Sequence, residues 1–357
     1  MNEPTGSELR RRAPASMSSP AAGAADPSDG ARETCVLLVQ LGTPDAPEPG
    51  AVRRYLRQFL SDPRVVEIPR VVWLPILYGI VLTRRPRASA DKYRSIWTPE
   101  GSPLLINSQR QAAALQQAMA AAGRRVRVAL AMRYGEPDLG RVLRRLRDDG
   151  MQRLLVLPMY PQYSASTAAS VFDAVWRELR SWRVQPEMRT VRQFHDDPAW
   201  IAALAARLQR AWQSDGQPEQ LVLSFHGLPQ RSVDLGDPYQ AQCRRTAELL
   251  VAALGLRDDA VHVTFQSRFG KAKWLTPYTD RTLDALGRRR VGLVDVACPG
   301  FVADCIETLE EIAIEGRETF ERAGGGRFRY QSCLNDDPAA IDALRVLCDR
   351  HLQGWPS

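Results

Sequence analysis

The sequence predicts an α/β protein made of two doubly wound, Rossmann-like halves, each with a parallel sheet flanked by helices. Short apolar runs rich in Val and Leu alternate with longer helical patterns, and a turn signal lies between them. This alternation is typical of βαβ units whose strands are covered on both faces. At 357 residues, with 44% hydrophobic and 25% charged residues, the chain has the length and composition of a two-domain globular protein. The expected strands are "CVLLVQL", "VRVALAM", "RLLVLPM", "QLVLSF", "AVHVTFQ" and "RVGLVDV".

These elements divide the chain into four parts. Residues 1–33 are rich in Ala, Pro, Ser and Gly without apolar periodicity, which predicts a disordered leader, and they lack the apolar centre of a secretion signal. Residues 34–190 form the expected N-terminal α/β domain and residues 191–335 the C-terminal one. Residues 336–352, within "DDPAAIDALRVLCDRHL", predict a closing helix with an Asp cap and an early Pro, which packs back on the first domain.

Charge and cysteine usage narrow the classes of function. The net charge is +7, and because the first 33 residues carry four arginines against five acidic residues, the remainder carries +8. No zinc-finger spacing or RNA-binding signature accompanies this charge, so nucleic acid is not the expected partner. The six cysteines are scattered without a CxxC pair, which favours reduced thiols in a cytoplasm. No apolar run reaches the ~18 to 20 residues of a spanning helix.

In parallel sheets the ligand lies beyond the carboxyl ends of the strands, so the residues after each strand matter most. None of these loops contains GxGxxG or GxxxxGK[ST], which argues against a nucleotide site. His226 ends the strand "LVLSF" before Gly227, where an imidazole can face a cleft as a neutral ligand or proton acceptor.

The stretch "CIETLEEIAIEGRE" follows another strand of the same half. On an α-helix, Glu307, Glu311 and Glu315 form one row, and Glu310 and Glu318 lie off it, where solvent exposure is expected. Glu307, in the opening turn, is expected to face the same cleft as His226. One His and one Glu make a poor storage site, but they suit a metal that only passes through, with the further carboxylates as oxygen ligands or proton relays.

The segment "VVWLPILYGIVL", residues 71–82, is too short to span a bilayer and is followed by "TRRPR". It fits either an exposed apolar flap, resting in a membrane interface or covering an apolar ligand, or an ordinary buried helix.

Nine motifs, in order, give the chain a resemblance to the ferrochelatase family, whose members insert ferrous iron into protoporphyrin, and to its Gram-negative bacterial form in particular. The resemblance runs from about Cys35 to the closing helix. The motifs are "LVQLGTPDAP", "YRSIWTPEGSPL", "MRYG", "LPMYPQYSAST", "LSFHGLP", "GDPYQAQC", "FQSRFGKAKWLTPYTD", "CPGFVADCIETLEEIAIEG" and "CLND".

The resemblance implies a lyase that forms protohaem from protoporphyrin IX and releases two protons, the last step of haem biosynthesis. It implies catalytic roles for His226 and Glu307, which face each other over the porphyrin, and metal contacts from His226, Glu307, Glu311 and Glu315. The substrate-binding residues that it implies are Arg85, Tyr93, Ser102, Arg133, Tyr134 and Tyr160.

Two departures from the family pattern stand out. Ala165 occupies a position where some relatives have a cysteine of a [2Fe-2S] cluster, so no cluster and no resident cofactor is expected, and Fe²⁺ is a substrate. Leu41 replaces the Tyr or Met that some relatives have before the first "GT", which removes an axial metal contact. The expected location is the cytoplasm, with peripheral contact at the cytoplasmic face of the inner membrane.

Three alternatives remain open at the level of sequence. A chelatase for another tetrapyrrole, such as coproporphyrin III with iron or sirohydrochlorin with cobalt, differs only in ring substituents and metal. A haem or metal carrier requires persistent iron ligands, which one His and a row of carboxylates do not supply. A membrane-binding or nucleic-acid-binding module predicts that binding survives the loss of His226 and Glu307.

Overall fold

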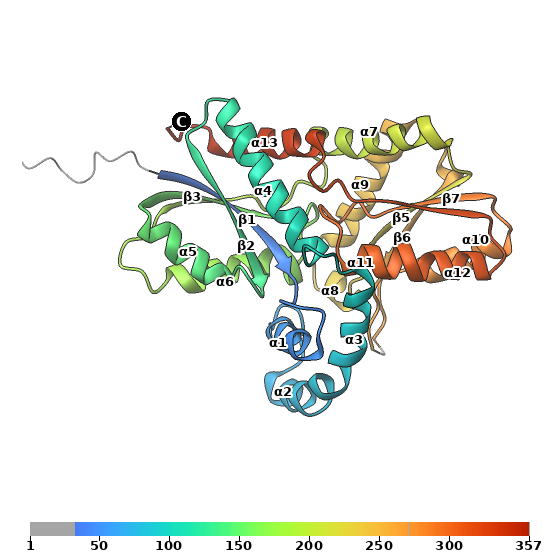
Figure 1. The fold of residues 1–357 in the computed structure, drawn as a ribbon, viewed down its shortest axis with the longest axis horizontal. Helices are drawn as coiled ribbons and strands as arrows, with labels where there is room; N and C mark the ends of the chain where they lie inside the picture. Colours follow the sequence, from blue (N-terminus) through green and yellow to red (C-terminus); the bar gives the residue numbers. More distant parts are fainter. Residues whose placement is uncertain (1–32, 271, 357) are drawn as a thin grey trace, which may run out of the picture. The chain divides into compact units, whose positions relative to one another are not determined.

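The computed structural model describes residues 33–270 and 272–356, and within them the chain forms two four-stranded parallel sheets (Figure 1). The first has the order β2-β1-β3-β4, with strands β1 (Glu33–Gly42), β2 (Val126–Tyr134), β3 (Met151–Pro158) and β4 (Glu187–Thr190). The second has the order β6-β5-β7-β8, with strands β5 (Gln220–His226), β6 (Val261–Gln266), β7 (Leu293–Ala297) and β8 (Arg327–Gln331). The predicted fold class is therefore confirmed. Apart from Glu33, which begins β1, the predicted leader lies outside the described residues.

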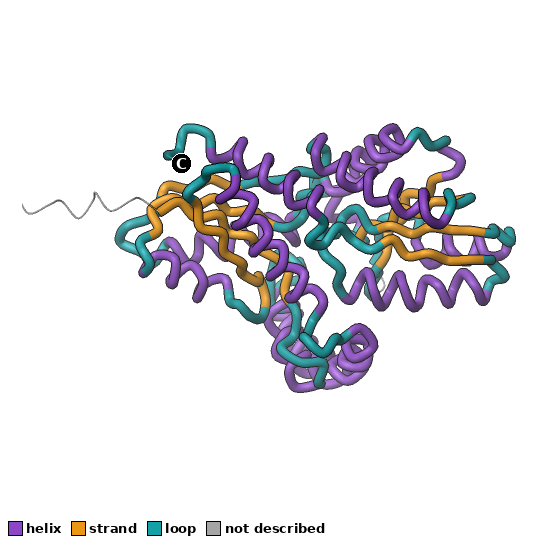
Figure 2. The backbone as a smooth tube through the Cα atoms, turned by 45° about the horizontal axis from the view of Figure 1, so that its top comes forward, coloured by secondary structure: helices purple, strands orange, loops and turns teal. Residues whose placement is uncertain are grey.

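Helices cover both faces of the first sheet, which explains its continuous apolar strands (Figure 2). Successive β1 side chains point to opposite faces. Val36 and Leu38 pack with α4 (Pro103–Ala121) and α13 (Pro338–Leu352). Cys35, Leu37 and Val39 pack with α5 (Leu139–Asp148) and α6 (Ser170–Leu179) on the other face.

The second sheet is covered in the same way. Leu223 and Phe225 of β5 pack toward α7 (Pro198–Asp215) and α9 (Tyr239–Leu254), and Val222 packs toward α10 (Thr279–Arg288) and α12 (Arg317–Arg322). Shorter elements complete this half: α8 (Gln230–Asp234), η4 (Asp258–Ala260), α11 (Ile306–Thr308) and the π-helix η5 (Leu309–Gly316).

The closing helix α13 begins at an Asp cap, since the Asp337 side chain accepts a hydrogen bond from the N–H of Ala339, with Pro338 in the first turn. It contacts both α4 and α7, and its Leu344 and Leu347 share a core cluster with β1 of the first sheet. The predicted boundary at residue 190 coincides with the end of β4. The division into separate domains stays a prediction.

A helical excursion leaves the carboxyl end of β1 and returns at α4. It comprises α1 (Pro49–Leu60), α2 (Arg70–Ile76), the π-helix η2 (Leu77–Val81) and α3 (Leu82–Ile96). We call residues 70–96 the flap. Trp73, Leu77 and Leu82 face its own core, whereas Val71 and Ile80 are 84% and 51% exposed. The two interpretations of residues 71–82, an exposed apolar segment and an ordinary buried helix, are thus each partly right, because this segment buries one face and exposes the other. None of the described helices combines the length and the hydropathy that crossing a membrane requires.

Candidate functional site

His226 ends β5 with one ring nitrogen already bonded. Its Nδ1 lies 2.7 Å from the carbonyl oxygen of Gly227, and because a carbonyl only accepts, Nδ1 must donate. In the neutral ring the lone pair is then on Nε2, which can accept a proton or bind a metal. The neighbouring Gly227 is required by space, since a Cβ there would lie 2.4 Å from the carbonyl oxygen of Gln266 at the end of β6.

Glu307 lies in the single turn α11, which the Thr308 side chain fixes by accepting a hydrogen bond of 3.0 Å from the N–H of Cys305. Its backbone oxygen accepts a 2.7 Å hydrogen bond from the Gln266 side chain, which ties α11 to the end of β6. Burial, and then the Glu307 carboxylate, raise the pKa of Tyr93 well above its usual value. The half-buried Glu307 therefore lies beside the flap as well as beside the second sheet.

Glu311 completes a cluster with His226 and Glu307. Its carboxylate accepts hydrogen bonds from the Ser267 hydroxyl and, at 2.6 Å, from the Ser267 N–H. Burial raises the pKa of Glu311 above its usual value, and the negative charge of Glu307 raises it further. The hydrogen bonds from Ser267 and the nearby His226 act in the opposite direction and lower this pKa. The Gln266 side chain donates to the Glu307 backbone oxygen at 2.7 Å and to the Glu311 carboxylate at 3.5 Å. Gln266 also pairs with His226 in the sheet, so the three predicted residues lie around the carboxyl ends of β5 and β6.

Ser267 is a functional candidate that sequence reasoning missed. It follows β6 directly and has a φ of 63°, a left-handed conformation that is uncommon for a residue other than Gly. Such conformations cluster at functional sites. The position immediately after a strand was the available signal, within "FQSRFG".

The carboxylates do not form the expected row on an α-helix. The backbone of Leu309–Gly316 is instead a π-helix, in which hydrogen bonds join residues i and i+5. Side chains five residues apart then share a face, and Lys92 of α3 binds both Glu310 (2.9 Å) and Glu315 (2.7 Å). The expectation that Glu310 is solvated was wrong, since Glu310 is only 7% exposed and burial raises its pKa. Glu318 is exposed as expected. A metal contact from Glu315 stays a prediction.

Aromatic side chains of the flap and of α1 lie next to the acidic cluster. Tyr93 makes edge-to-face contacts with Tyr55, at a centroid distance of 6.5 Å, and with Trp97, at 6.2 Å. The pKa of Tyr160 is raised by burial, with Tyr134 and Glu307 contributing. The sequence analysis selected Tyr93 and Tyr160 but missed Tyr55 and Trp97. These two lie in or at the end of helical patterns that are typical of an ordinary core, so nothing in the sequence marked them as site residues.

The remaining predicted substrate contacts fall into three environments. Ser102, at the start of α4, is buried, and its hydroxyl lies 2.8 Å from that of Thr43 in the loop after β1. Arg85 is exposed on the flap with its guanidinium 4.3 Å from the centroid of the Phe269 ring, beyond β6. Substrate binding by Ser102 and Arg85 stays a prediction.

Arg133 and Tyr134 instead belong to a buried polar network at the carboxyl end of β2. The Arg133 guanidinium pairs with Asp62 and donates from Nε to the Ser170 hydroxyl at 2.8 Å. The Tyr134 hydroxyl donates to the same Asp62 carboxylate at 2.8 Å. Their role in substrate binding stays a prediction; in this structure Arg133 supplies the counter-charge of Asp62 and Tyr134 donates a hydrogen bond to it.

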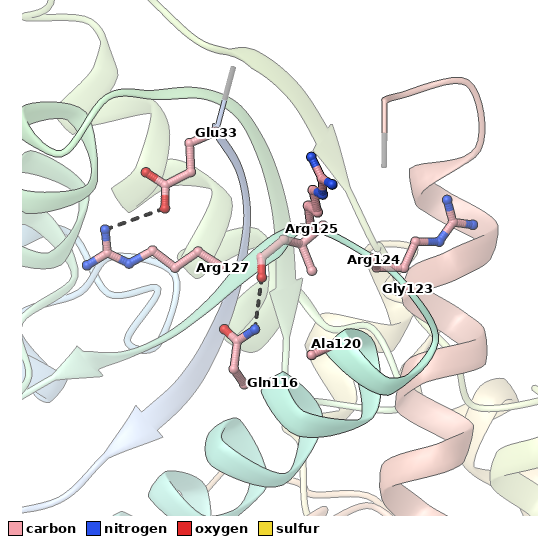
Figure 3. A pocket seen from close by; sticks show the side chains of 8 residues that line it. Glu33, Gln116, Ala120, Gly123, Arg124, Arg125 and Arg127 are labelled. Atoms are coloured by element: carbon pink, nitrogen blue, oxygen red, sulfur yellow. Dashed lines mark hydrogen bonds and ion pairs between the residues drawn. The ribbon is translucent and has the colours of Figure 1, made fainter. Parts of the chain in front are cut away.

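A hollow of about 700 Å³ lies elsewhere, at the amino ends of β1 and β2 and the end of α4 (Figure 3). Its lining includes Glu33, Gln116 and Arg127, and the Gln116 amide donates to the carbonyl of Val126 at 2.9 Å. Because it lies at the opposite ends of the strands and contains none of the predicted site residues, we do not assign it to the cleft. Among residues 33–270 and 272–356, no three His, Cys, Asp or Glu side chains are arranged to hold a metal ion.

Comparison with known proteins places this site in a family. The family model described as Ferrochelatase matches residues 33–352. Ferrochelatases of Bordetella pertussis and Azoarcus sp. are 56% and 58% identical to the chain over 322 residues, 90% of this chain and 89% and 88% of theirs. Among solved structures, SirB from Bacillus subtilis with Fe³⁺ has a TM-score of 0.55 at 12% identity, covering 90% of this chain and 96% of its own, which shows a shared fold. The predicted resemblance is confirmed, and the chain belongs to the ferrochelatase family.

Proposed function

We propose that this chain is a ferrochelatase of the lyase class, which inserts Fe²⁺ into protoporphyrin IX to form protohaem and releases two protons. The observation that carries the proposal is the cluster of His226, Glu307 and Glu311 at the strand ends, beside an aromatic wall, in a chain of this family. Fe²⁺ and the porphyrin are both substrates.

The chemistry assigns a role to each group. Two pyrrole N–H protons must leave as the metal enters, and the free Nε2 of neutral His226 is the base for the first. Glu307, half-buried in a one-turn helix, binds the incoming metal or passes a proton outward. Glu311 has a pKa raised by burial and lies close to both, so it can hold a proton that has left the ring or attract the dication. Trp97 and Tyr160, which are only partly buried, offer aromatic surface to the macrocycle, and Arg85 offers a cation to a propionate.

Iron and protoporphyrin are favoured over another tetrapyrrole by sequence relationship. The relatives at 53% to 58% identity are ferrochelatases, whereas the sirohydrochlorin chelatase SirB in complex with cobalt shares only 11% identity and shows the fold alone. A panel of purified porphyrins with ferrous iron measures this choice directly.

The flap offers an apolar surface suited to a lipid bilayer. Val71, Val72 and Ile80 are 84%, 51% and 51% exposed, and Arg84 and Arg87 are exposed just beyond them. Apolar side chains flanked by arginines favour the interface of an anionic bilayer. We therefore propose a cytoplasmic protein that rests peripherally on the inner membrane, from which an apolar porphyrin reaches the cleft. Flotation with phosphatidylglycerol vesicles should fall for Val71→Ser with Ile80→Ser, and the Val184→Ser variant, whose exposed Val lies outside the flap, should float like wild type.

We also propose that the enzyme works without an iron–sulfur cluster. Such clusters need cysteine thiolates, and Ala165 supplies no thiol where some relatives of the family have one. The six cysteines are all buried, and burial raises the pKa of Cys35 to about 12. Purified enzyme should carry activity with no acid-labile sulfide, and sulfide in proportion to activity would refute this proposal.

One experiment tests the catalytic proposal. Protoporphyrin fluorescence is followed anaerobically with ferrous iron for wild type, His226→Ala and Glu307→Gln. His262→Ala is the matched control, because His262 lies on β6 and its ring bonds to the Gln220 side chain, away from the proposed site. Insertion should fall at least about a hundredfold in the first two variants, the scale of a lost general base, and persist in the control. Full activity in both site variants would overturn the mechanism.

A further inference from the structure

Lys92 joins the flap to the π-helix η5, and the chemistry above gives it no task. Its Nζ donates to Glu310 at 2.9 Å and to Glu315 at 2.7 Å. Lys92 lies on α3 immediately before Tyr93, and α3 contacts both η5 and α11. A single ammonium group therefore links the flap to the helix that carries Glu311.

The bridge depends on the hydrogen-bond pattern of the helix. In an α-helix, residues five apart point about 140° away from each other, so one ammonium group could not bind both carboxylates. In a π-helix the bonds run i→i+5, so residues five apart lie about one turn apart on the same face. Glu310 and Glu315 meet at Lys92 only because Leu309–Gly316 is in the π form.

The same pattern sets the direction of Glu311. Glu311 follows Glu310 in the chain but binds the N–H and hydroxyl of Ser267 on the side of the second sheet. Conversion of η5 to an α-helix would rotate each side chain after Leu309 relative to Glu307 in α11. The face bound by Lys92 and the face that points toward Ser267 and His226 are thus coupled through one backbone.

We infer that Lys92 is a positioning residue: by bridging Glu310 and Glu315 it holds η5 in the π form and so directs Glu311 toward Ser267 and His226. Lys92 also lies between two carboxylates that would otherwise repel each other on one face of the helix. The flap and the acidic cluster are consequently held in one arrangement.

The inference rests on the proposed function. Its test measures the rate of iron insertion by the full-length chain as a function of Fe²⁺ concentration. Lys92→Met keeps the unbranched apolar stem of the side chain and removes the ammonium group with both bonds, so we expect the KM for Fe²⁺ to rise about tenfold, as for other lost outer partners of metal-binding groups. The KM for protoporphyrin should stay at the wild-type value. Lys92→Arg should recover most of the loss, and Arg94→Met, which breaks an exposed ion pair on the same helix, should behave as wild type.

A double-mutant cycle separates positioning from general damage. If Lys92 acts through Glu311, Lys92→Met should add no further rise in KM for Fe²⁺ to that of Glu311→Gln. The variant with both Lys92→Met and Glu310→Gln loses the bridge without leaving a buried carboxylate unpaired, so it should fold and still show the raised KM.

The outcomes are distinct from those of the proposed function. An unchanged KM for Fe²⁺ in Lys92→Met, full additivity with Glu311→Gln, or a parallel rise in the KM for protoporphyrin would each overturn the positioning role. The proposed function fails only if wild type inserts no iron or if His226→Ala and Glu307→Gln both insert it undiminished.

Discussion

Replacing Asp62 with Asn should destabilise the fold strongly, because Asp62 is the buried carboxylate to which Arg133 is bound. Asp62 is 6% exposed and accepts hydrogen bonds from the Arg64 N–H (2.8 Å), the Tyr134 hydroxyl (2.8 Å) and the Ser170 hydroxyl (2.6 Å). Asn keeps one acceptor oxygen but replaces the other with an NH₂ group, which cannot accept hydrogen bonds from these donors. The substitution also leaves the guanidinium of Arg133 without a counter-charge. Breaking a buried pair from one side costs about 3 to 5 kcal/mol.

Urea unfolding of wild type and Asp62→Asn measures this loss. Asp173→Asn is the matched control, since Asp173 pairs with Arg64 at 2.8 Å on the surface and such pairs are worth about 0 to 1 kcal/mol. A loss for Asp62→Asn no larger than that of the control would refute the reasoning.

The pH dependence of the loss is a second check. Although burial opposes it, the pKa of Asp62 is lowered by the bonds from Ser170, Arg64 and Tyr134 and by the charge of Arg133. A carboxyl group whose pKa is lowered on folding stabilises the folded state. This stabilisation is fully present above the pKa of Asp in the unfolded chain, about 3.9, and is lost as the pH falls through the pKa of Asp62 in the folded protein. The difference between wild type and Asp62→Asn should therefore be constant near neutral pH and shrink below about pH 4.

Three further predictions address the ends of the second sheet and the thiols. Gly227→Ala places a Cβ 2.4 Å from the Gln266 carbonyl oxygen and should cost about 1 to 3 kcal/mol in urea unfolding, whereas Gly50→Ala, which meets no atom within 4 Å, should cost nothing. Ser267→Ala keeps the N–H bond to Glu311 but loses the hydroxyl bond, so kcat/KM for iron should fall roughly tenfold; an unchanged value would exclude orientation of Glu311 by this hydroxyl. Because the six cysteines are all buried, a thiol reagent should label none in the native enzyme and all six after unfolding, and rapid native labelling would contradict the burial.

Periodicity and strand ends predicted the fold class and the place of His226, because both follow from local pattern. The apolar runs that mark β1 and β5 are buried on both faces, and His226 is the last residue of β5. Glu311 was selected for its spacing from Glu307, and in the structure the Gln266 side chain contacts both residues. The hydrogen-bond partners of Glu311 could not be predicted, since Ser267 lies 44 residues away in sequence.

The π-helix was beyond prediction for a related reason. The segment "LEEIAIEG" has no local signal that distinguishes i→i+5 from i→i+4 bonding, and the group that makes the difference, Lys92, lies 218 residues before Glu310 in the chain. A row of carboxylates on an α-helix accumulates repulsion along a single face. In this structure the charges have separate partners: Lys92 binds Glu310 and Glu315, and Ser267 binds Glu311. The like charges of this helix are thus tolerated because groups of the flap and of the loop after β6 bind them.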